Sequence, residues 1–337
     1  MRNIYDLTIK ELEDYFISIN EKKFRAVQVY EALYKRRIKS FDDMTNISKE
    51  VREKLKQDFS FYKIKMLIKQ KGKNVNKYLF ELEDGNKIES VLMFHDYGTS
   101  ICVSSQVGCN MTCAFCESGR LKKVRNLLAY EIVQQILQIE EDINKRITHV
   151  VLMGIGEPFD NYDNVLRFVK IINCGKGIDI GSRHITISTC GVIPGIKKFM
   201  NEEGQVNLAI SLHAPNNTLR SRIMPINKAY PLNELMETIK EYINKTNRRV
   251  TFEYIMLDNV NDSEENAKEL AILLKGINCY VNLIPYNETE NIEFKRTKEW
   301  KIMNFYDILK KNKINVTIRK EFGGSVDAAC GQLRANN

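Results

Sequence analysis

The chain has 337 residues, with 51 lysines and arginines against 43 aspartates and glutamates, a formal net charge of +8, and 43% hydrophobic residues. This composition is typical of a globular protein with one large domain or two moderate ones, and it excludes a fibrous or disordered chain. No run of about 18 uncharged apolar residues occurs, and no apolar segment follows Met1, so we expect a cytoplasmic protein with no membrane association.

The first 60 residues have a helical pattern. Thr8 and Glu11 form a capping box ahead of an apolar stripe, and a further segment over 48–59 has the same period. Between them, apolar residues recur at helical spacing at Ala26, Val29, Tyr30 and Leu33. The pattern predicts a small helical domain over 1–60.

Residues 61–98 differ from this helical start. The stretch 61–80 contains six lysines and no acidic residue, and an Asp84-Gly85 turn then separates two apolar β-rich runs. The turn predicts a hairpin that leads into a larger sheet. A basic stretch of this kind fits either contact with a polyanion or a solvated surface. The same two interpretations apply to Arg120, Lys122, Lys123 and Arg125.

From about residue 100 the chain alternates short apolar runs with amphipathic stretches. The runs are 101–104, 149–153, 184–188, 206–212, 249–255, 280–285 and 315–319, and the helical stretches include 129–141, 162–172, 232–243, 264–274 and 299–310. This alternation predicts an α/β fold of βαβ units around a parallel sheet, either open or curled into a barrel, over 99–320.

Polar signals follow five of these runs, at the points where strands are expected to end. In such folds the chemistry lies beyond the carboxyl ends of the strands. We therefore expect these signals to share one rim of the sheet: the cysteine group 109–116, the segment from Gly154 to Glu157, the segment from Ser188 to Gly191, the segment from Ser211 to His213, and Asn287.

Cys109, Cys113 and Cys116 have Cys-x3-Cys-x2-Cys spacing. Three thiolates this close can hold one iron–sulfur cube and leave one iron without a protein ligand. A structural zinc site is the alternative, but it would require a fourth cysteine or histidine nearby, and His95 lies well upstream. The spacing therefore favours an iron–sulfur cluster.

This cysteine spacing, with an aromatic residue before the last cysteine, resembles the radical S-adenosylmethionine (SAM) superfamily. The wider set of motifs is similar to the RlmN/Cfr family of radical SAM methyltransferases, which act on adenine in 23S ribosomal RNA, and the similarity spans essentially the whole chain. The motifs are Cys102-Val-Ser-Ser-Gln, Met153-Gly-Ile-Gly-Glu-Pro, Ile210-Ser-Leu-His-Ala-Pro-Asn, Arg222-Ile-Met-Pro-Ile-Asn, Val281-Asn-Leu-Ile-Pro-Tyr-Asn and Asp327-Ala-Ala-Cys-Gly-Gln-Leu.

The resemblance implies a radical SAM partial TIM barrel, (β/α)6, with an N-terminal helical accessory domain that binds RNA. It implies one [4Fe-4S] cluster on Cys109, Cys113 and Cys116, with SAM on the open iron and two SAM molecules used per turnover. It also implies that SAM contacts Gly156, Glu157, Ser188, Ser211, Leu212, His213 and Asn287.

The resemblance also assigns three catalytic residues. Cys330, in the tail 321–337, is methylated by one SAM molecule, and a radical derived from a second SAM activates that methyl group so that it adds to the adenine ring. Cys102 helps to deprotonate the ring and resolves the protein–RNA adduct through a transient disulfide with Cys330. Glu89 occupies the place of the acidic proton acceptor.

The implied substrates are 23S rRNA, in its peptidyl transferase region, and certain tRNAs, at the adenosine 3′ of the anticodon. We expect methylation at carbon 2, with carbon 8 as the alternative, and a monomer that receives electrons from a flavodoxin or ferredoxin. A non-catalytic iron–sulfur RNA-binding protein, or a radical SAM enzyme acting on a peptide or metabolite, stays open. Glu117 departs from the family pattern, which usually has a small residue there.

Overall fold

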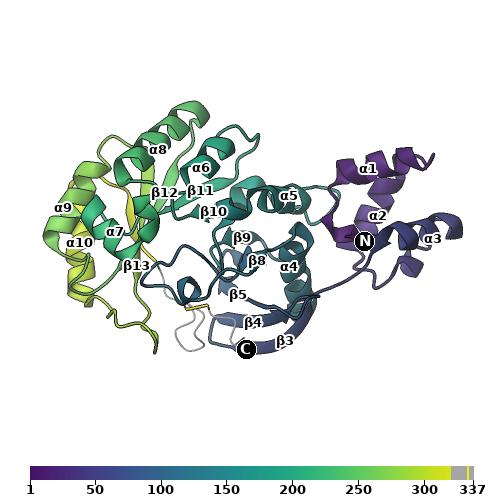
Figure 1. Ribbon diagram of the computed structural model, residues 1–337, viewed down its shortest axis with the longest axis horizontal. Coiled ribbons are helices and arrows are strands. Elements are labelled where there is room, and N and C mark those ends of the chain that lie inside the picture. The colour runs from purple at the N-terminus through teal and green to yellow at the C-terminus, as the bar shows by residue number, and fades with distance from the viewer. Residues whose placement is uncertain (320–331, 334–337) are drawn as a thin grey trace.

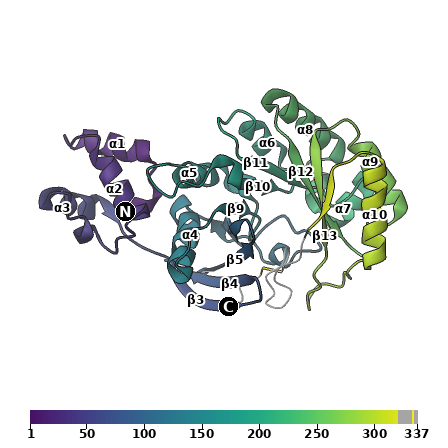
Figure 2. The same cartoon turned by 180° about the vertical axis from the view of Figure 1, so that it is seen from behind.

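The computed structural model describes residues 1–319 and 332–333 (Figure 1). A group of N-terminal helices lies at one end of the molecule, and a curved sheet covered by helices forms the rest. Helices α9 (Glu264–Leu273) and α10 (Glu299–Lys311) lie at the end opposite to the N-terminal helices (Figures 1 and 2).

The N-terminal helices are α1 (Ile9–Ser18), α2 (Arg25–Tyr34) and α3 (Lys49–Asp58). The predicted capping box begins α1, because Thr8 accepts a hydrogen bond from the Glu11 backbone and the Glu11 side chain accepts one from the Thr8 backbone. Ser48 caps α3 in the predicted third helical segment. Strands β1 (Arg2–Asn3) and β2 (Phe59–Ser60) pair in parallel, which brings the two ends of this helical part together.

This helical part packs directly on the rest of the chain. Arg167 of α5 (Tyr162–Ile172) donates a hydrogen bond to Glu11 over 2.6 Å, and the backbone of Tyr130 in α4 (Ala129–Ile143) donates one to Asp6. One hydrophobic core contains both Phe16 of α1 and Ile136 of α4. Burial of apolar surface across this junction stabilises the position of the helices.

The main sheet has ten strands in the order β14-β13-β12-β11-β10-β9-β6-β5-β4-β3. From β6 to β14 all neighbours are parallel and follow chain order, which is the topology of a barrel, and β14 and β3 are the two edges within the described residues. The parallel strands are β6 (Gly98–Cys102), β9 (His149–Leu152), β10 (Ile185–Thr189), β11 (Asn207–Ser211), β12 (Val250–Met256), β13 (Cys279–Pro285) and β14 (Val316–Ile318).

The predicted hairpin extends this sheet on the β6 side. Strands β3 (Lys65–Lys71), β4 (Val75–Glu81) and β5 (Lys87–His95) pair antiparallel in sequence, and β5 pairs antiparallel with β6. Strand β6 therefore joins an antiparallel half of the sheet to a parallel half. Because these pairings are continuous, one sheet runs from the basic N-terminal strands to the end of the barrel.

The helices that alternate with the parallel strands cover one face of the sheet (Figure 1). Besides α4, α5, α9 and α10 they are α6 (Ile193–Phe199), α7 (Asn217–Ile223) and α8 (Leu232–Thr246). Two short strands, β7 (Gln106–Val107) and β8 (Arg125–Asn126), pair at the base of the cysteine loop. Within the described part of the chain, no helix has the length and apolar character needed to cross a membrane.

Candidate active site

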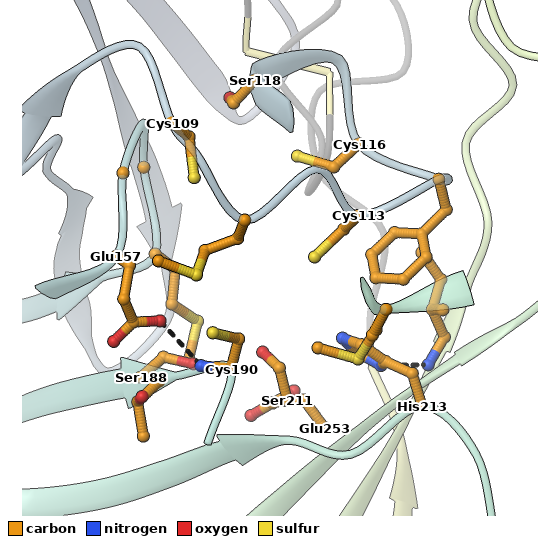
Figure 3. Close-up of a pocket in the computed structure, with 18 of the residues that line it drawn as sticks. Cys109, Cys113, Cys116, Ser118, Glu157, Ser188, Cys190, Ser211, His213 and Glu253 are labelled. Atoms are coloured by element: carbon orange, nitrogen blue, oxygen red, sulfur yellow. Dashed lines mark hydrogen bonds between the residues drawn. The ribbon is translucent and has the colours of Figure 1, made fainter. Parts of the chain in front are cut away.

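The three cysteines of the motif line one cavity at the carboxyl ends of the parallel strands. The thiols of Cys109, Cys113 and Cys116 point into this cavity from the loop after β7 (Figure 3). The opposite wall comes from the loops after β9 and β11 and from the carboxyl ends of β10 and β11, through Glu157, His213, Ser188 and Ser211 among others. The structure thus brings together four of the five predicted rim signals.

Backbone hydrogen bonds fix the cysteine loop. The Cys109 N–H donates to the Leu121 carbonyl over 2.9 Å, and the Cys116 N–H donates to the Cys113 carbonyl over 3.1 Å. Burial raises the pKa of the Cys109 thiol to about 12, and it raises the pKa of Cys113 well above its ordinary value. Thiols in such surroundings stay protonated until a metal ion replaces the proton.

The donor set fits an iron–sulfur cube better than a single ion. Within residues 1–319 and 332–333, no three histidine, cysteine or acidic side chains converge closely enough to hold one metal ion. A cube has no such requirement, because each cysteine binds a different iron atom. Three thiols that surround one cavity, without meeting at one point, are therefore compatible with a cluster that has one open iron.

Gly156 lets the loop after β9 pack closely against Gln106. Its φ is +108°, and a Cβ atom built there would lie 2.6 Å from the Cβ atom of Gln106. An L-residue is disfavoured by this backbone conformation and by the lack of space. The Gln106 side chain accepts a hydrogen bond from the Glu157 N–H over 2.9 Å, which fixes the turn at the cavity wall.

The Glu157 carboxylate is bound by the protein itself. One oxygen accepts the Phe159 N–H over 3.0 Å, and the other accepts the Cys190 N–H over 2.8 Å (Figure 3). Burial raises the pKa of Glu157, and the N–H donors oppose that effect. The sequence suggested a carboxylate directed at the methionine amino group of SAM; the structure adds a second task, the connection of the loops after β9 and β10.

His213 lines the cavity in its neutral form. Its Nδ1 accepts the Ile255 N–H over 3.0 Å, so the proton of the neutral ring is on Nε2. Burial, with Arg220 nearby, lowers the pKa of His213 to about 3. Phe115 and His213 make an edge-to-face aromatic contact, with their ring centroids 4.8 Å apart.

The remaining predicted SAM contacts differ in position. Ser188 and Ser211 line the cavity. The Leu212 side chain is buried in the main hydrophobic core instead, and its backbone N–H donates to the Glu253 carbonyl over 3.1 Å. Asn287 follows the end of β13, is half-buried and is not among the residues that line the cavity.

Glu89 and Cys102 lie on the same face of the sheet. Val91 of β5 is paired directly with Cys102 of β6, and Glu89 is two residues before Val91, so all three side chains share one face. Cys102 is buried with Val91, Ile155 and Leu333, and Met153 both packs on this cluster and lines the cavity. Cys330 lies outside the described residues.

Two buried charged residues of the site carried no clear sequence signal. Arg220 is fully buried and donates hydrogen bonds to the carbonyls of Cys190, Ser211 and Leu212 and to the side chain of Asn227. It thereby connects the loops after β10 and β11. A sequence offers only an arginine in a short helix at this position, because the burial results from long-range packing.

Glu253 of β12 is the second such residue, and alternation alone did not show whether it pointed inward. It lines the cavity (Figure 3), and its Oε1 accepts a hydrogen bond from Asn282 over 3.0 Å. Its Oε2 is buried and accepts no hydrogen bond within the described part of the chain. Burial raises the pKa of Glu253, with the charge of Arg319 acting in the opposite direction.

Glu117, the departure from the family pattern, is also buried. It is 3% exposed, neither carboxylate oxygen has a hydrogen bond among the described residues, and the Arg120 Nε lies 3.9 Å from its Oε2. Arg120 in turn donates to the Asn291 carbonyl. Glu117 therefore adds a buried carboxylate at the position that follows Cys116, the last cysteine of the loop.

The basic residues near the site fall into two groups. Lys65, Lys71, Lys73 and Lys122 are exposed. Lys65 among them also lies 3.9 Å from Glu81. The other six members of the stretches 61–80 and 120–125 all have protein partners: Lys63 donates to the Ile38 carbonyl, Lys69 pairs with Asp142, Lys77 pairs with Glu89, Arg120 donates to the Asn291 carbonyl, Lys123 pairs with Asp160, and Arg125 binds Glu131 and Asp84. Only the exposed residues of these two basic stretches are thus well placed for the RNA contacts expected from the sequence.

Comparison with known proteins places the chain in a family. Residues 2–60 match the model of the ribosomal RNA large subunit methyltransferase N-terminal domain, and residues 103–271 match the radical SAM superfamily. A protein of Spiroplasma citri named "Probable dual-specificity RNA methyltransferase RlmN" is 53% identical over 100% of this chain and 98% of its own length. A protein of the same name from Streptococcus thermophilus is 55% identical over 99% and 88%.

A solved structure gives the same result. The crystal structure of a radical SAM methyltransferase from Sphaerobacter thermophilus has a TM-score of 0.94 and 40% sequence identity, and each chain is covered completely. The match confirms the radical SAM fold with its helical N-terminal part. With this fold, the cysteine cavity and full-length relatives above 50% identity, the chain belongs to the RlmN family of radical SAM RNA methyltransferases.

Proposed function

We propose that this enzyme methylates carbon 2 of an adenosine in the peptidyl transferase region of 23S rRNA, and of the adenosine 3′ of the anticodon in certain tRNAs. The observation that carries the proposal is the junction at Met153. This residue belongs both to the wall of the cysteine cavity and to the cluster around Cys102. A base that reached Cys102 would therefore lie next to the cofactor site.

Family membership implies a [4Fe-4S] cluster and SAM as cofactors, and we propose that this cavity holds them. We propose that Cys109, Cys113 and Cys116 hold three of the irons. The residues proposed to bind SAM are Gly156, Glu157, Ser188, Ser211, Leu212, His213 and Asn287, all of which except Leu212 and Asn287 line the cavity. The cluster and two SAM molecules per turnover supply the methyl group, the electron and the hydrogen-abstracting radical. The buried polar groups around Glu157 and Arg220 hold the loops in place and exclude water.

The chemistry at the base belongs to side chains of the chain itself. We propose that Cys330 carries the methyl group as S-methylcysteine and becomes bonded to adenine carbon 2 through that carbon. Glu89 accepts the proton that carbon 2 loses, assisted by Cys102. The Cys102 sulfur then bonds to the Cys330 sulfur as the bond between that sulfur and the transferred carbon breaks. The carbon takes up a proton to become the methyl group, the one electron left over from the radical addition would pass to the iron–sulfur cluster, and the methylated RNA is released.

Several further assignments are part of the same proposal. Residues 1–60 act as an RNA-binding accessory domain, 61–98 as a basic linker and hairpin, 99–320 as the catalytic core, and 321–337 as the tail that presents Cys330. We also propose that a flavodoxin or ferredoxin delivers the electrons, that the enzyme is a monomer, and that it works in the cytoplasm, where its RNA substrates are made. Exposed lysines such as Lys65 and Lys71 support the RNA-binding assignment.

The test is a reaction with defined components. Anaerobically reconstituted enzyme, reductant and SAM are incubated with protein-free 23S rRNA or with tRNA, and the nucleosides are separated and identified by mass spectrometry. We expect 2-methyladenosine. A product of 8-methyladenosine would reject the carbon 2 assignment, and no methyladenine in either RNA would reject the proposed function.

A variant tests the roles of the cysteines. Cys102→Ala should accumulate a covalent protein–RNA adduct that resists denaturing electrophoresis, because the resolving thiol is missing. Cys330→Ala should form no adduct, because it lacks the carrier sulfur. Equal behaviour of the two variants would contradict the assignment of one carrier and one resolving cysteine.

A further inference from the structure

Lys77 and Glu89 form an almost completely buried ion pair. The Lys77 Nζ lies 2.8 Å from the Glu89 Oε1, and the side chains are 12% and 6% exposed. Lys77 is on β4 and Glu89 on β5, which are adjacent antiparallel strands. The pair is thus held by the backbone of two neighbouring strands.

The register places this pair in line with Cys102. Lys77 is opposite Val91 on β5, and Val91 is opposite Cys102 on β6. Side chains of directly paired residues share one face of a sheet, so the three form a row across three strands. Glu89, two residues along from Val91, projects from the same face. The lysine therefore belongs to the surface that carries the proposed proton acceptor and the resolving cysteine.

Stability alone does not account for this pair. Removing an ammonium and a carboxylate from water costs about as much as their attraction returns, so a hydrophobic pair of similar size is often as stable. Lys77 also differs from the exposed Lys65, Lys71 and Lys73 of the same basic stretch. Its low exposure makes a role as a general phosphate contact a poor fit.

Resting on the proposed function of Glu89, we infer that Lys77 is a positioning residue for the proton transfer. The ammonium holds Oε1 in a fixed orientation and favours the ionised carboxylate, which is the form that accepts a proton. When the proton moves from adenine carbon 2 to Glu89, Lys77 keeps all three of its own protons. The attraction between the Lys77 ammonium and Glu89 is lost once the Glu89 carboxyl is protonated and neutral.

The inference is tested on the step that follows adduct formation. Reconstituted wild type, Lys77→Met, Lys77→Arg and Glu89→Gln are compared for three readouts: the mass of S-methylated protein, the amount of covalent RNA adduct, and the decay rate of that adduct against pH. Lys301→Met is the matched control, since Lys301 forms part-buried pairs with Asp258 and Asp262 and belongs to α10, a helix that Figure 1 shows away from β4 and β5.

Lys77→Met should be S-methylated normally and should form the adduct, and the adduct should decay at least roughly 10-fold more slowly because its proton acceptor is less often ionised. The acid limb of the decay rate should move up by about one pH unit. Lys77→Arg should recover most of the rate, and Lys301→Met should behave as wild type. A purely structural role would not move the pH profile.

Unchanged decay of the adduct in Lys77→Met would overturn the inference. If RNA binding were also weaker in that variant, Lys77 would be an RNA contact instead. Wild-type decay in Glu89→Gln would remove Glu89 as proton acceptor and Lys77 with it, whereas slow decay in Glu89→Gln alone would refute only the role of Lys77. If Lys77→Met does not fold, Lys77→Gln replaces it, because the amide can still donate a hydrogen bond to Oε1 without the charge.

Discussion

The Glu157 carboxylate accepts the backbone N–H of Cys190 over 2.8 Å and so joins two loops that follow neighbouring strands. Its other oxygen accepts the Phe159 N–H. An ionised or neutral carboxyl can serve both donors, but an amide cannot, because its NH2 group would face one of the two N–H groups.

Glu157→Gln should therefore loosen the SAM pocket. We expect a loss of about 1 to 3 kcal/mol in stability, since one buried N–H becomes unsatisfied. SAM affinity should fall roughly 10-fold, which corresponds to about 1.4 kcal/mol. Thermal unfolding and equilibrium dialysis with labelled SAM measure the two effects. If SAM affinity and stability were both unchanged, the connection that Glu157 makes between the two loops would be dispensable.

Replacement of Arg220 should have a larger effect on folding. Arg220→Met removes the buried donor from the carbonyls of Cys190 and Ser211 and from the side-chain oxygen of Asn227, whereas the Leu212 carbonyl keeps a hydrogen bond from the Ala214 N–H. At about 1 to 3 kcal/mol for each unsatisfied buried group, the loss should be at least about 3 kcal/mol. Arg222 is exposed two residues away, so Arg222→Met should change stability by less than about 0.5 kcal/mol. Equal melting temperatures of the two variants would contradict this account.

Gly156 and Gly85 allow backbone strain and lack of space to be separated. Both have positive φ, +108° and +80°, but a Cβ atom at Gly85 meets nothing within 4 Å. Gly85→Ala should thus cost only about 1 to 2 kcal/mol, from the conformation alone. Gly156→Ala adds a clash with Gln106 worth about 1 to 3 kcal/mol and should also lower SAM binding. Urea unfolding of the two variants gives the difference, and equal losses would refute it.

The neutral His213 predicts a pH dependence of stability. Its pKa is about 3 in the folded protein and about 6.5 in the unfolded chain, so the unfolded state binds the extra proton between these values. Stability should therefore fall as the pH drops below about 6.5, by up to about 1.4 kcal/mol per pH unit. His213→Gln keeps an acceptor for the Ile255 N–H but cannot titrate, so its melting temperature should fall less steeply between pH 7 and 5. Parallel curves would exclude this contribution.

Lys122, exposed beside the cysteine loop, provides a test of RNA contact. Lys122→Ala should weaken RNA binding and reduce the slope of log affinity against log salt by about 0.7 to 0.9, the value for one phosphate contact. Filter binding over a range of KCl concentrations measures the slope. Lys122→Arg, which keeps the charge, should retain it. A slope unaffected by Lys122→Ala would place the RNA elsewhere.

The alternation of strands and helices was predictable because it depends on local periodicity. The helix Tyr162–Ile172 begins and ends at the predicted residues, and the Thr8 capping box is present. Short helices α6 and α7 were not among the predicted stretches, since seven residues provide only two turns of pattern. Local sequence is informative where an element is long or its end is marked by a cap.

The site was predictable where chemistry requires a particular residue type and not where packing decides. Cysteine spacing and the glycine-rich turn led to the cavity. The roles of Arg220 and Lys77 could not be inferred, because each depends on which strand or loop lies beside it in the fold. Asn287 shows the reverse case, since a motif match did not place it in the cavity wall.

Strand β6 belongs to both halves of the sheet, and this makes the reaction centre sensitive to chain length. Side chains alternate between the two faces along a strand, so deletion of Ser90, between Glu89 and the Val91 that pairs with Cys102, would bring Ile88 to the catalytic face and turn the Glu89 carboxylate away. Substitutions on the opposite face of the sheet do not change which side chains point to the catalytic face. The protein should therefore accept many replacements along β4 and β5 but no single-residue insertion or deletion within them, so its hairpin can vary in composition far more readily than in length.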